Sequence, residues 1–328
     1  MSKILVIIPT YNHHEMINDI VYQSIDTYKG ELFEFEIHDG SSNDNTKEII
    51  ENYNKENRKL VKYYRYDSNI SLDEKCKIAI ENNKLEYFML LGDGNLYDFN
   101  NLELQLTKNN FDKYQVINLE PIIRRKFNNE LDAKINETIE YFDPIKYSKY
   151  YSHLTYFGGA IYNTNYIRNT FEKDYYKECR KANISWWLPL SIFNQFIDFQ
   201  KENKNIVCAN LYIDGLKGNS KKKDHSWADK EKYFVLTFEL FNKDIGLLYS
   251  DYDSVKKQIV KTFRADSLAS KRYLIQKRIN KDINLKLVRK YKKDIKYVNG
   301  YYRFMIFICL VPRFVFKIVK KLYKFIKR

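Results

Sequence analysis

Two apolar segments near the N-terminus, each followed by a polar loop, constrain the fold more than any other feature of the sequence. Residues 4–8 are all aliphatic, and such a run is typical of a strand buried on both faces of a parallel sheet. We expect Pro9 to end this strand, because proline has no N–H to donate to a neighbouring strand. Apolar residues at helical spacing predict a helix from Met16 to Ile25, and residues 33–37 predict a second strand. Parallel strands of such a unit end at one edge of the sheet, where open α/β sheets bind ligands.

Further apolar runs extend this pattern along the chain. Amphipathic helices are predicted around residues 49–53, 72–80 and 102–106, and strands at residues 61–66, 87–91, 115–119 and 206–213. The sequence therefore predicts an α/β fold with a mixed, mainly parallel sheet flanked by helices.

Composition excludes several classes of protein. The chain has 328 residues, of which 30% are charged and 16% aromatic, as in folded and not in disordered proteins. Its four cysteines lie far apart and form no Cys-x-x-Cys pair, which argues against a disulfide framework and a zinc site. The N-terminal apolar run is too short for a signal peptide, so we expect the cytoplasm as the compartment.

Charge divides the chain into two parts. Residues 1–215 contain 26 Lys and Arg against 32 Asp and Glu, whereas residues 216–328 contain 30 against 10. This asymmetry predicts a first domain over residues 1–215 and a basic helical region over residues 216–328 that meets an anionic partner.

Polar loops follow three of the predicted strands. They are Thr10-Tyr11-Asn12, residues 39–46 beginning Asp39-Gly40-Ser41-Ser42, and Gly92-Asp93-Gly94-Asn95. Each loop also fits ordinary turn chemistry, and Asn45 fits a helix N-cap. The first two loops lie at the strand ends of one strand–helix–strand unit, and the third follows a strand expected beside the first, which favours a shared ligand site over three unrelated turns.

Residues 7–12 together with residues 39–46 resemble the family 2 glycosyltransferases of the GT-A fold. The resemblance covers roughly the first hundred residues. It implies inverting transfer of a sugar from a nucleotide-sugar, with a UDP-sugar as the expected donor. The residues that it places against the donor are Pro9, Thr10, Tyr11, Asn12, Asp39, Ser41, Ser68, Gly92 and Asp93.

The resemblance also implies a divalent cation, Mn²⁺ or Mg²⁺, which would neutralise the charge that grows on the leaving diphosphate. Asp93, Asn95 and His225 are the expected ligands, although Asn95 stands in place of a second carboxylate and therefore brings no charge. Lys221–Lys223 would contact the phosphates, and the alternative is a solvated lysine loop.

An inverting transfer needs a base near the acceptor hydroxyl. Relatives carry an acidic pair where this chain has Trp186 and Trp187, so the candidates are Glu178 first, then Asp198 and then Asp174. Residues 156–162 resemble the glycine-containing strand that lines the sugar pocket, and they equally fit a glycine-rich turn that leads into an edge strand.

The C-terminal segment, about residues 301–328, predicts a helix that lies on a membrane. Its uninterrupted apolar run, residues 304–311, is far shorter than the roughly 20 residues needed to span a bilayer. Beyond Pro312, bulky apolar residues fall on one helical face and lysines on the other. Such a helix suits the anionic inner leaflet of the cell membrane; packing against the protein's own core or in a homo-oligomer is the alternative.

These features predict a peripheral enzyme on the inner face of the membrane that acts on a lipid-linked glycan acceptor in bacterial surface-polysaccharide synthesis. A GT-A-like scaffold that binds nucleotide-sugars without efficient catalysis is the alternative, favoured by the missing carboxylates. The apolar face of the tail argues against a nucleic-acid partner.

Overall fold

The computed structural model describes residues 2–56, 60–121, 135–141, 157–171, 206–213, 217–218, 238, 271–297 and 300–326. The chain forms two compact units, one made of Met1–Pro144 and His153–Lys223 and the other of Ile145–Ser152 and Asp224–Arg328. The predicted boundary at residue 215 stays a prediction.

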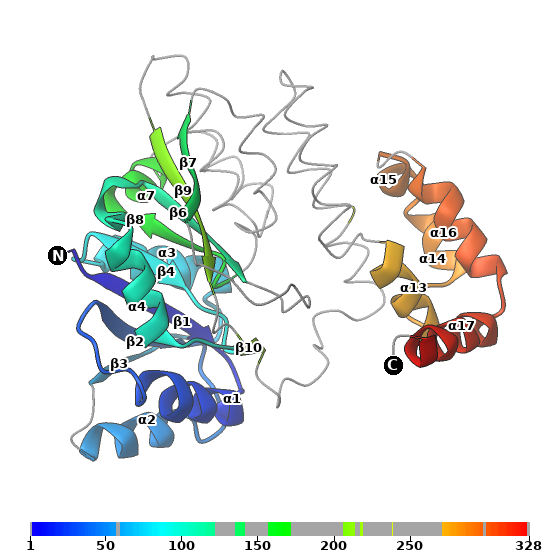
Figure 1. Ribbon diagram of the computed structural model, residues 1–328. Helices are drawn as coiled ribbons and strands as arrows, with labels where there is room; N and C mark the ends of the chain where they lie inside the picture. Colours follow the sequence, from blue (N-terminus) through cyan, green and yellow to red (C-terminus); the bar gives the residue numbers. More distant parts are fainter. Residues whose placement is uncertain are drawn as a thin grey trace. The chain divides into compact units, whose positions relative to one another are not determined.

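The first unit is built on an eight-stranded sheet in the order β3-β2-β1-β4-β8-β6-β9-β7 (Figure 1). Strands β7 and β8 run antiparallel to their neighbours, and the other strands share one direction. The predicted mixed, mainly parallel sheet is therefore confirmed. The strands are β1 (Ile4–Thr10), β2 (Phe33–Asp39), β3 (Val61–Arg65), β4 (Tyr87–Leu90), β6 (Val116–Pro121), β7 (Ile135–Tyr141), β8 (Ala160–Asn163) and β9 (Ile206–Ile213).

Helices cover both faces of this sheet. They are α1 (His14–Asp19), which continues as the π-helical turn η1 (Ile20–Ile25), α2 (Thr46–Lys55), α3 (Leu72–Asn82), α4 (Phe99–Lys108), the 3₁₀ turn η2 (Phe111–Lys113) and α7 (Thr164–Phe171). The short strand β5 (Asn95–Leu96) pairs separately with β10 (Lys217–Gly218).

Strand β1 lies at the centre of the core, and all seven of its residues are buried. Ile4, Val6 and Ile8 belong to the cluster that includes buried side chains of α1, η1, α2 and α4. Side chains alternate along a strand, so Leu5 and Ile7 face the other side, where α3 contacts β1. This two-sided burial confirms the prediction made from the aliphatic run.

The expectation that Pro9 ends this strand is wrong, because β1 continues to Thr10 and Pro9 is paired with His38. Ile7 O accepts a hydrogen bond from Leu91 N, whereas Thr10 O accepts one from Gly40 N on the opposite side. Hydrogen-bonding direction alternates along a strand, so the nitrogen of Pro9 faces the β4 side. Pairing with β4 has already ended at Ile7, and no N–H is needed there.

A turn at Phe157 and Gly158 leads into β8, which pairs with β4 on one side and β6 on the other. The glycine-rich turn is therefore present, but the strand after it is not an edge strand. Gly158 has φ +97°, a left-handed conformation that glycine adopts without a steric penalty.

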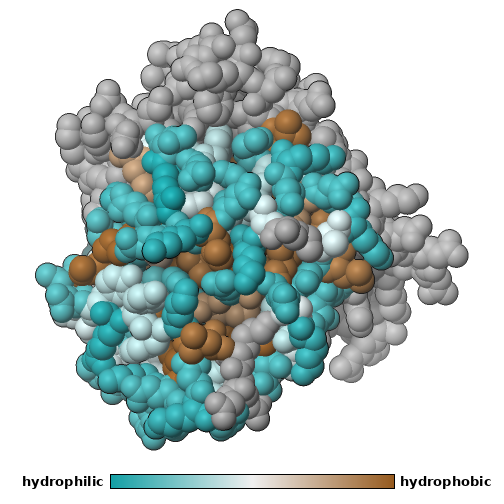
Figure 2. All heavy atoms as spheres, turned by 90° about the vertical axis from the view of Figure 1, so that its left-hand side faces the viewer, coloured by the Kyte–Doolittle hydropathy of each residue, from teal (hydrophilic) through white to brown (hydrophobic). Residues whose placement is uncertain are grey.

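One face of the protein is shown as spheres in Figure 2, where hydrophilic residues surround smaller groups of hydrophobic ones. Among the described residues of the first unit, the large apolar side chains that are exposed lie at separate positions along the chain: Tyr11, Leu60, Tyr64, Leu72 and Leu104. Scattered apolar residues of this kind are normal on a protein surface.

The second unit contains helices α13 (Lys271–Ile279), α14 (Leu285–Lys290), α15 (Lys292–Tyr297), α16 (Tyr301–Leu310) and α17 (Arg313–Ile326). Helices are thus present in the described residues 271–297 and 300–326 of the predicted basic region, whereas Lys217–Gly218 form strand β10. Arg278 joins two parts of the unit, since its guanidinium donates to Ile283 O (3.3 Å), Ile308 O (3.1 Å) and Cys309 O (2.9 Å). Within the described residues, no helix has the length and apolarity to cross a bilayer.

Candidate active site

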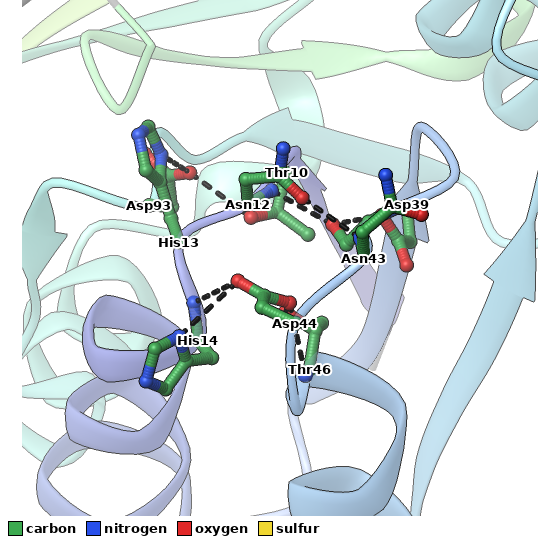
Figure 3. Close-up of polar contacts among 10 residues, drawn as sticks. Thr10, Asn12, His13, His14, Asp39, Asn43, Asp44, Thr46 and Asp93 are labelled. Carbon is green, nitrogen blue, oxygen red and sulfur yellow. Dashed lines mark hydrogen bonds and ion pairs between the residues drawn. The ribbon is translucent and has the colours of Figure 1, made fainter.

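Three loops meet at one edge of the first unit's sheet. Strands β2, β1 and β4 are parallel neighbours, so the loops that follow them emerge side by side. Thr10 Oγ1 donates to Asp93 Oδ2 (3.1 Å), and Asn12 N donates to Ser42 Oγ (2.8 Å). Figure 3 shows these contacts among the residues of the three loops. The predicted convergence of the loops is therefore present.

Asn12 links the first loop to the second through both its backbone and its side chain. Its backbone N–H donates to Ser42 Oγ, and its side-chain Oδ1 accepts from Asn43 N (2.8 Å). Asn12 has φ 55° and Ser41 has φ 67°, a region where asparagine is enriched and serine is unusual. Ser41 Oγ donates to Tyr66 O (2.5 Å), which holds that conformation. The loops are thus fixed by hydrogen bonds within the protein.

Asp39 is fully buried and organises the second loop. Its Oδ1 accepts from Ser42 N (2.9 Å) and Ser42 Oγ (2.5 Å), and its Oδ2 accepts from Tyr63 OH (2.5 Å). Burial, together with this bond to a carboxylate, raises the pKa of Tyr63. The sequence predicts that Asp39 contacts the donor; in this structure its two oxygens hold the loop, and the donor contact stays a prediction.

Asp93 receives a second hydrogen bond, from His13, which the sequence analysis did not select. Nδ1 of His13 lies 2.7 Å from Asp93 Oδ2, and the two side chains are 43% and 17% exposed. Both groups are therefore accessible from solvent. The pair of histidines after the first loop was the available signal, but sequence alone does not tell which of them faces Asp93.

The second histidine has a different partner. Asp44 Oδ2 accepts from His14 N (2.9 Å), and Asp44 Oδ1 accepts from Thr46 N (3.1 Å) and Thr46 Oγ1 (2.5 Å). Burial alone would raise the pKa of Asp44, but these hydrogen bonds outweigh it and lower the pKa. Asn45 is the N-cap residue of α2 but makes no side-chain capping bond; Asp44 supplies the carboxylate and ties together the starts of α1 and α2.

Lys75 of α3 brings a buried positive charge to the loops. The side chain is only 5% exposed, and a Cβ atom built on Gly40 would lie 2.5 Å from its Nζ, next to Thr10 O and Tyr11 Cδ2 at 3.6 Å. Burial lowers the pKa of Lys75, and the charges of Cys76, Asp39 and Asp93 partly offset that effect. Within the described part of the chain, Lys75 forms no ion pair.

Lys75 is not among the predicted site residues, because its helix α3 was predicted from its apolar positions alone. A signal was present, since Lys75 lies four residues before Ala79 and beside Cys76, on the face that becomes buried. A lysine on an apolar helix face is costly to bury without a partner. The arrangement therefore marks Lys75 as a candidate anion-binding residue.

The loop after β4 is closed by residues near Gly158. Asn95 N donates to Gly92 O (3.0 Å), and Asn95 Nδ2 donates to Phe157 O (3.2 Å). A Cβ atom on Gly92 would lie 3.3 Å from Asn95 Nδ2, so the backbone here is tightly enclosed. Tyr97 OH also donates to Gly158 O. The role of Asn95 as a metal ligand stays a prediction.

The remaining predicted residues divide into two groups. Pro9 lies inside β1, Tyr11 is half exposed, and Ser68 lies in the turn after β3. The proposed bases Glu178, Asp198 and Asp174, and the proposed metal ligand His225, lie outside the described residues.

The donor atoms near Asp93 fit a small divalent cation. Among the described residues, no three His, Cys, Asp or Glu side chains gather into one group, but the Asp93 carboxylate, the His13 imidazole and the Thr10 hydroxyl lie together. Mg²⁺ at phosphate-transfer sites is commonly held by one or two carboxylates, with substrate phosphates and water completing its shell. A set with few protein ligands is therefore sufficient.

Solved glycosyltransferases share this fold over most of the chain. TarS 1–349 of S. aureus, in complex with UDP-GlcNAc, matches with a TM-score of 0.55 and 14% identity, over 92% of this chain and 82% of that one. The mannosyltransferase PcManGT of Pyrobaculum calidifontis, in complex with GDP-Man and Mn²⁺, matches with a TM-score of 0.50 and 12% identity, over 98% and 88%. No curated protein sequence matches the chain.

A sequence family model identifies the family of this chain. The model of Glycosyl transferase family 2 matches residues 5–171, about half of the chain. That span contains β2, β4, all of β1 except Ile4, and the three loops that follow these strands. The chain therefore belongs to glycosyltransferase family 2, and it is a glycosyltransferase with a GT-A fold.

Proposed function

We propose that the enzyme transfers a sugar, with inversion, from a UDP-sugar to a lipid-linked glycan acceptor during assembly of a bacterial surface polysaccharide. The observation that supports donor binding best is the group of three interlocked loops with the buried ammonium of Lys75 beside them. A nucleoside diphosphate is dianionic or more, and a desolvated cation interacts strongly with it.

The described residues suggest how the donor is held. Tyr11 presents a half-exposed ring beside Gly40 and Lys75, which suits stacking against a base. Lys75 would meet the diphosphate and stabilise the charge that grows on it as the sugar leaves. Mn²⁺ or Mg²⁺, held by Asp93, would add Lewis-acid neutralisation of the same charge. The acceptor hydroxyl would attack from the opposite side, with Glu178, Asp198 or Asp174 as base.

Donor hydrolysis and donor binding test this proposal directly. A panel of nucleotide-sugars is compared by thermal shift, because a ligand at 100 times its Kd adds about 2.7 kcal/mol to the free energy of unfolding. Hydrolysis of the best donor with Mn²⁺ is then measured for the wild type and Asp93→Ala. Binding without turnover in any condition would favour the scaffold alternative, and no binding of any nucleotide would overturn the proposal.

We also propose that the second unit attaches the enzyme to an anionic membrane surface, which places it at the inner face of the cell membrane. The exposed large apolar residues of the described part of this unit lie on α16 and α17: Phe307 (59%), Leu310 (68%), Phe314 (63%), Ile318 (51%) and Val319 (57%). Exposed Lys317 and Lys320 lie on the same helix as the last three. Bulky apolar groups flanked by cations are the pattern of an interfacial helix.

Point substitutions test membrane binding better than removal of residues 301–328. Tyr301, Met305 and Ile308 are buried, so deleting α16 would damage the second unit. The double variant Phe314→Ser with Ile318→Ser is expected to lose flotation with anionic liposomes. Leu104→Ser, equally exposed but in the first unit, is the control. Unchanged flotation of the double variant would contradict this part of the proposal.

A further inference from the structure

We propose that His13 is a direct ligand of the divalent cation and takes the place of the carboxylate that the Gly92–Asn95 loop lacks. This inference rests on the proposed transferase function and concerns the same site. His13 Nδ1 and Asp93 Oδ2 are 2.7 Å apart. They come from the loops after two adjacent strands, β1 and β4, and both side chains reach solvent.

The loop after β4 has few other ligands to offer. Gly92 and Gly94 have no side chains, and the amide nitrogen of Asn95 is bound to Phe157 O. Asn95 is also buried, with 6% exposure. Asp93 is therefore the carboxylate of this loop, and the neighbouring side chain with a metal-binding nitrogen is His13 (Figure 3).

The spacing of the two atoms suits one small cation. Ligands about 2.1 Å from an octahedral ion lie about 3.0 Å apart at adjacent positions. His13 Nδ1 and Asp93 Oδ2, now 2.7 Å apart, would have to separate by only about 0.3 Å to reach this spacing. Thr10 Oγ1 lies 3.1 Å from the same oxygen of Asp93. Phosphate oxygens of the donor and water would fill the remaining positions.

An imidazole ligand also has a consequence for metal choice. Mg²⁺ strongly prefers oxygen, whereas transition ions accept imidazole nitrogen more readily. The enzyme should therefore bind Mn²⁺ more tightly than Mg²⁺ in the presence of UDP. Replacing His13 with alanine should reduce the preference for Mn²⁺ over Mg²⁺, because only oxygen ligands would then remain.

His14 provides a matched control. It has the same 43% side-chain exposure and also lies beside an aspartate, with Nδ1 3.3 Å from Asp44 Oδ2. The Asp44 carboxylate already accepts hydrogen bonds from Thr46, at the start of α2, and from the backbone N–H of His14. His14→Ala thus removes a neighbouring imidazole without changing the proposed cation site.

The experiment is electron spin-echo spectroscopy of Mn²⁺ bound with UDP to the full chain, which detects the ¹⁴N coupling of a coordinated imidazole. Because His225 is also a predicted ligand, the variants are compared in a His225→Ala background. The coupling should be present in that background and with His14→Ala added, and absent with His13→Ala or His13→Gln added, whose Mn²⁺ affinity should fall about tenfold or more. Coupling that persists in the His13 variants of this background, or that is already lost in His225→Ala alone, would overturn the inference.

UDP binding in EDTA is measured in parallel to separate the two proposals. UDP binding without any Mn²⁺ uptake would overturn the role of His13 and leave the transferase proposal standing. If UDP binds in neither condition, the proposed function itself fails. Thermal unfolding of each variant confirms that the fold is retained.

Discussion

Replacing Lys75 with methionine separates the stability of the empty protein from its affinity for a diphosphate. Lys75 is 5% exposed, its ammonium lies against Gly40, and it forms no ion pair within the described part of the chain. Burying a charge costs several kcal/mol unless it is paired, and Asp39 and Asp93 repay only part of that cost. Methionine keeps most of the side-chain volume and removes the charge.

The two expected effects have opposite signs. Without ligand, Lys75→Met should raise the free energy of unfolding by about 1–2 kcal/mol, the part of the burial cost that is not offset. UDP binding should weaken about 10- to 150-fold, which corresponds to the loss of a charged hydrogen bond of about 1.5–3 kcal/mol. A substitution that merely damaged the fold would lower both quantities.

The pH dependence gives an independent check. The pKa of Lys75 is lowered in the folded protein from its ordinary 10.5, so the unfolded chain binds the proton more tightly. Wild-type stability should therefore rise as pH increases through the folded pKa towards 10.5, because the buried charge is lost. Lys75→Met should lack this rise.

Chemical denaturation, with UDP titration by calorimetry, measures both effects. Lys77→Met is the control, because Lys77 lies on the same helix, is partly exposed and pairs with Glu81 at 2.6 Å; such a pair contributes about 0.5 kcal/mol or less. A less stable Lys75→Met protein, or a UDP affinity within twofold of wild type, would refute the reasoning.

Three further substitutions test other parts of the structure. Asp44→Ala should destabilise the first unit by about 1–3 kcal/mol. Because the pKa of Asp44 in the folded protein lies below 3.8, this contribution is complete above pH 3.8 and is lost as the pH falls through the folded pKa. The denaturation curves of wild type and variant should therefore differ at pH 7 and approach each other at pH 3. Gly158→Ala should cost about 1–2 kcal/mol of unfolding free energy from φ +97° and a Cβ placed 3.1 Å from Tyr97 OH; an unchanged Tm would contradict this. Arg278→Ala should lower the stability of the second unit by about 2–3 kcal/mol through three carbonyls left without their donor, and hydrogen exchange in α16 that matches wild type would disprove it.

Much of the first unit could be predicted because its signals are local. Residues 4–8 identify β1 by composition alone, and residues 206–213 identify β9 in the same way. Because parallel strands end at a common edge of the sheet, the sequence also predicts that Asn12, Asp39 and Asp93 lie near one another. Periodicity and strand order are enough for that conclusion.

The parts that were missed depend on contacts between distant segments. Whether Pro9 ends β1 depends on where β4 stops pairing, and β8 became an internal strand because β6 covers its second side. Lys75 and His13 become candidate site residues only through their contacts with Gly40 and Asp93, which lie far away in sequence. No local pattern encodes these neighbours.

The interlocking of Asn12 with Ser42 and Asn43 bears on how quickly and how selectively a donor is captured. Because the hydrogen bonds of these loops are already made within the protein, arrival of a ligand requires little ordering of the backbone here. Capture should then proceed in one kinetic phase over this part of the surface, without a slow rearrangement. Discrimination between competing donors would appear mainly in how long each one resides.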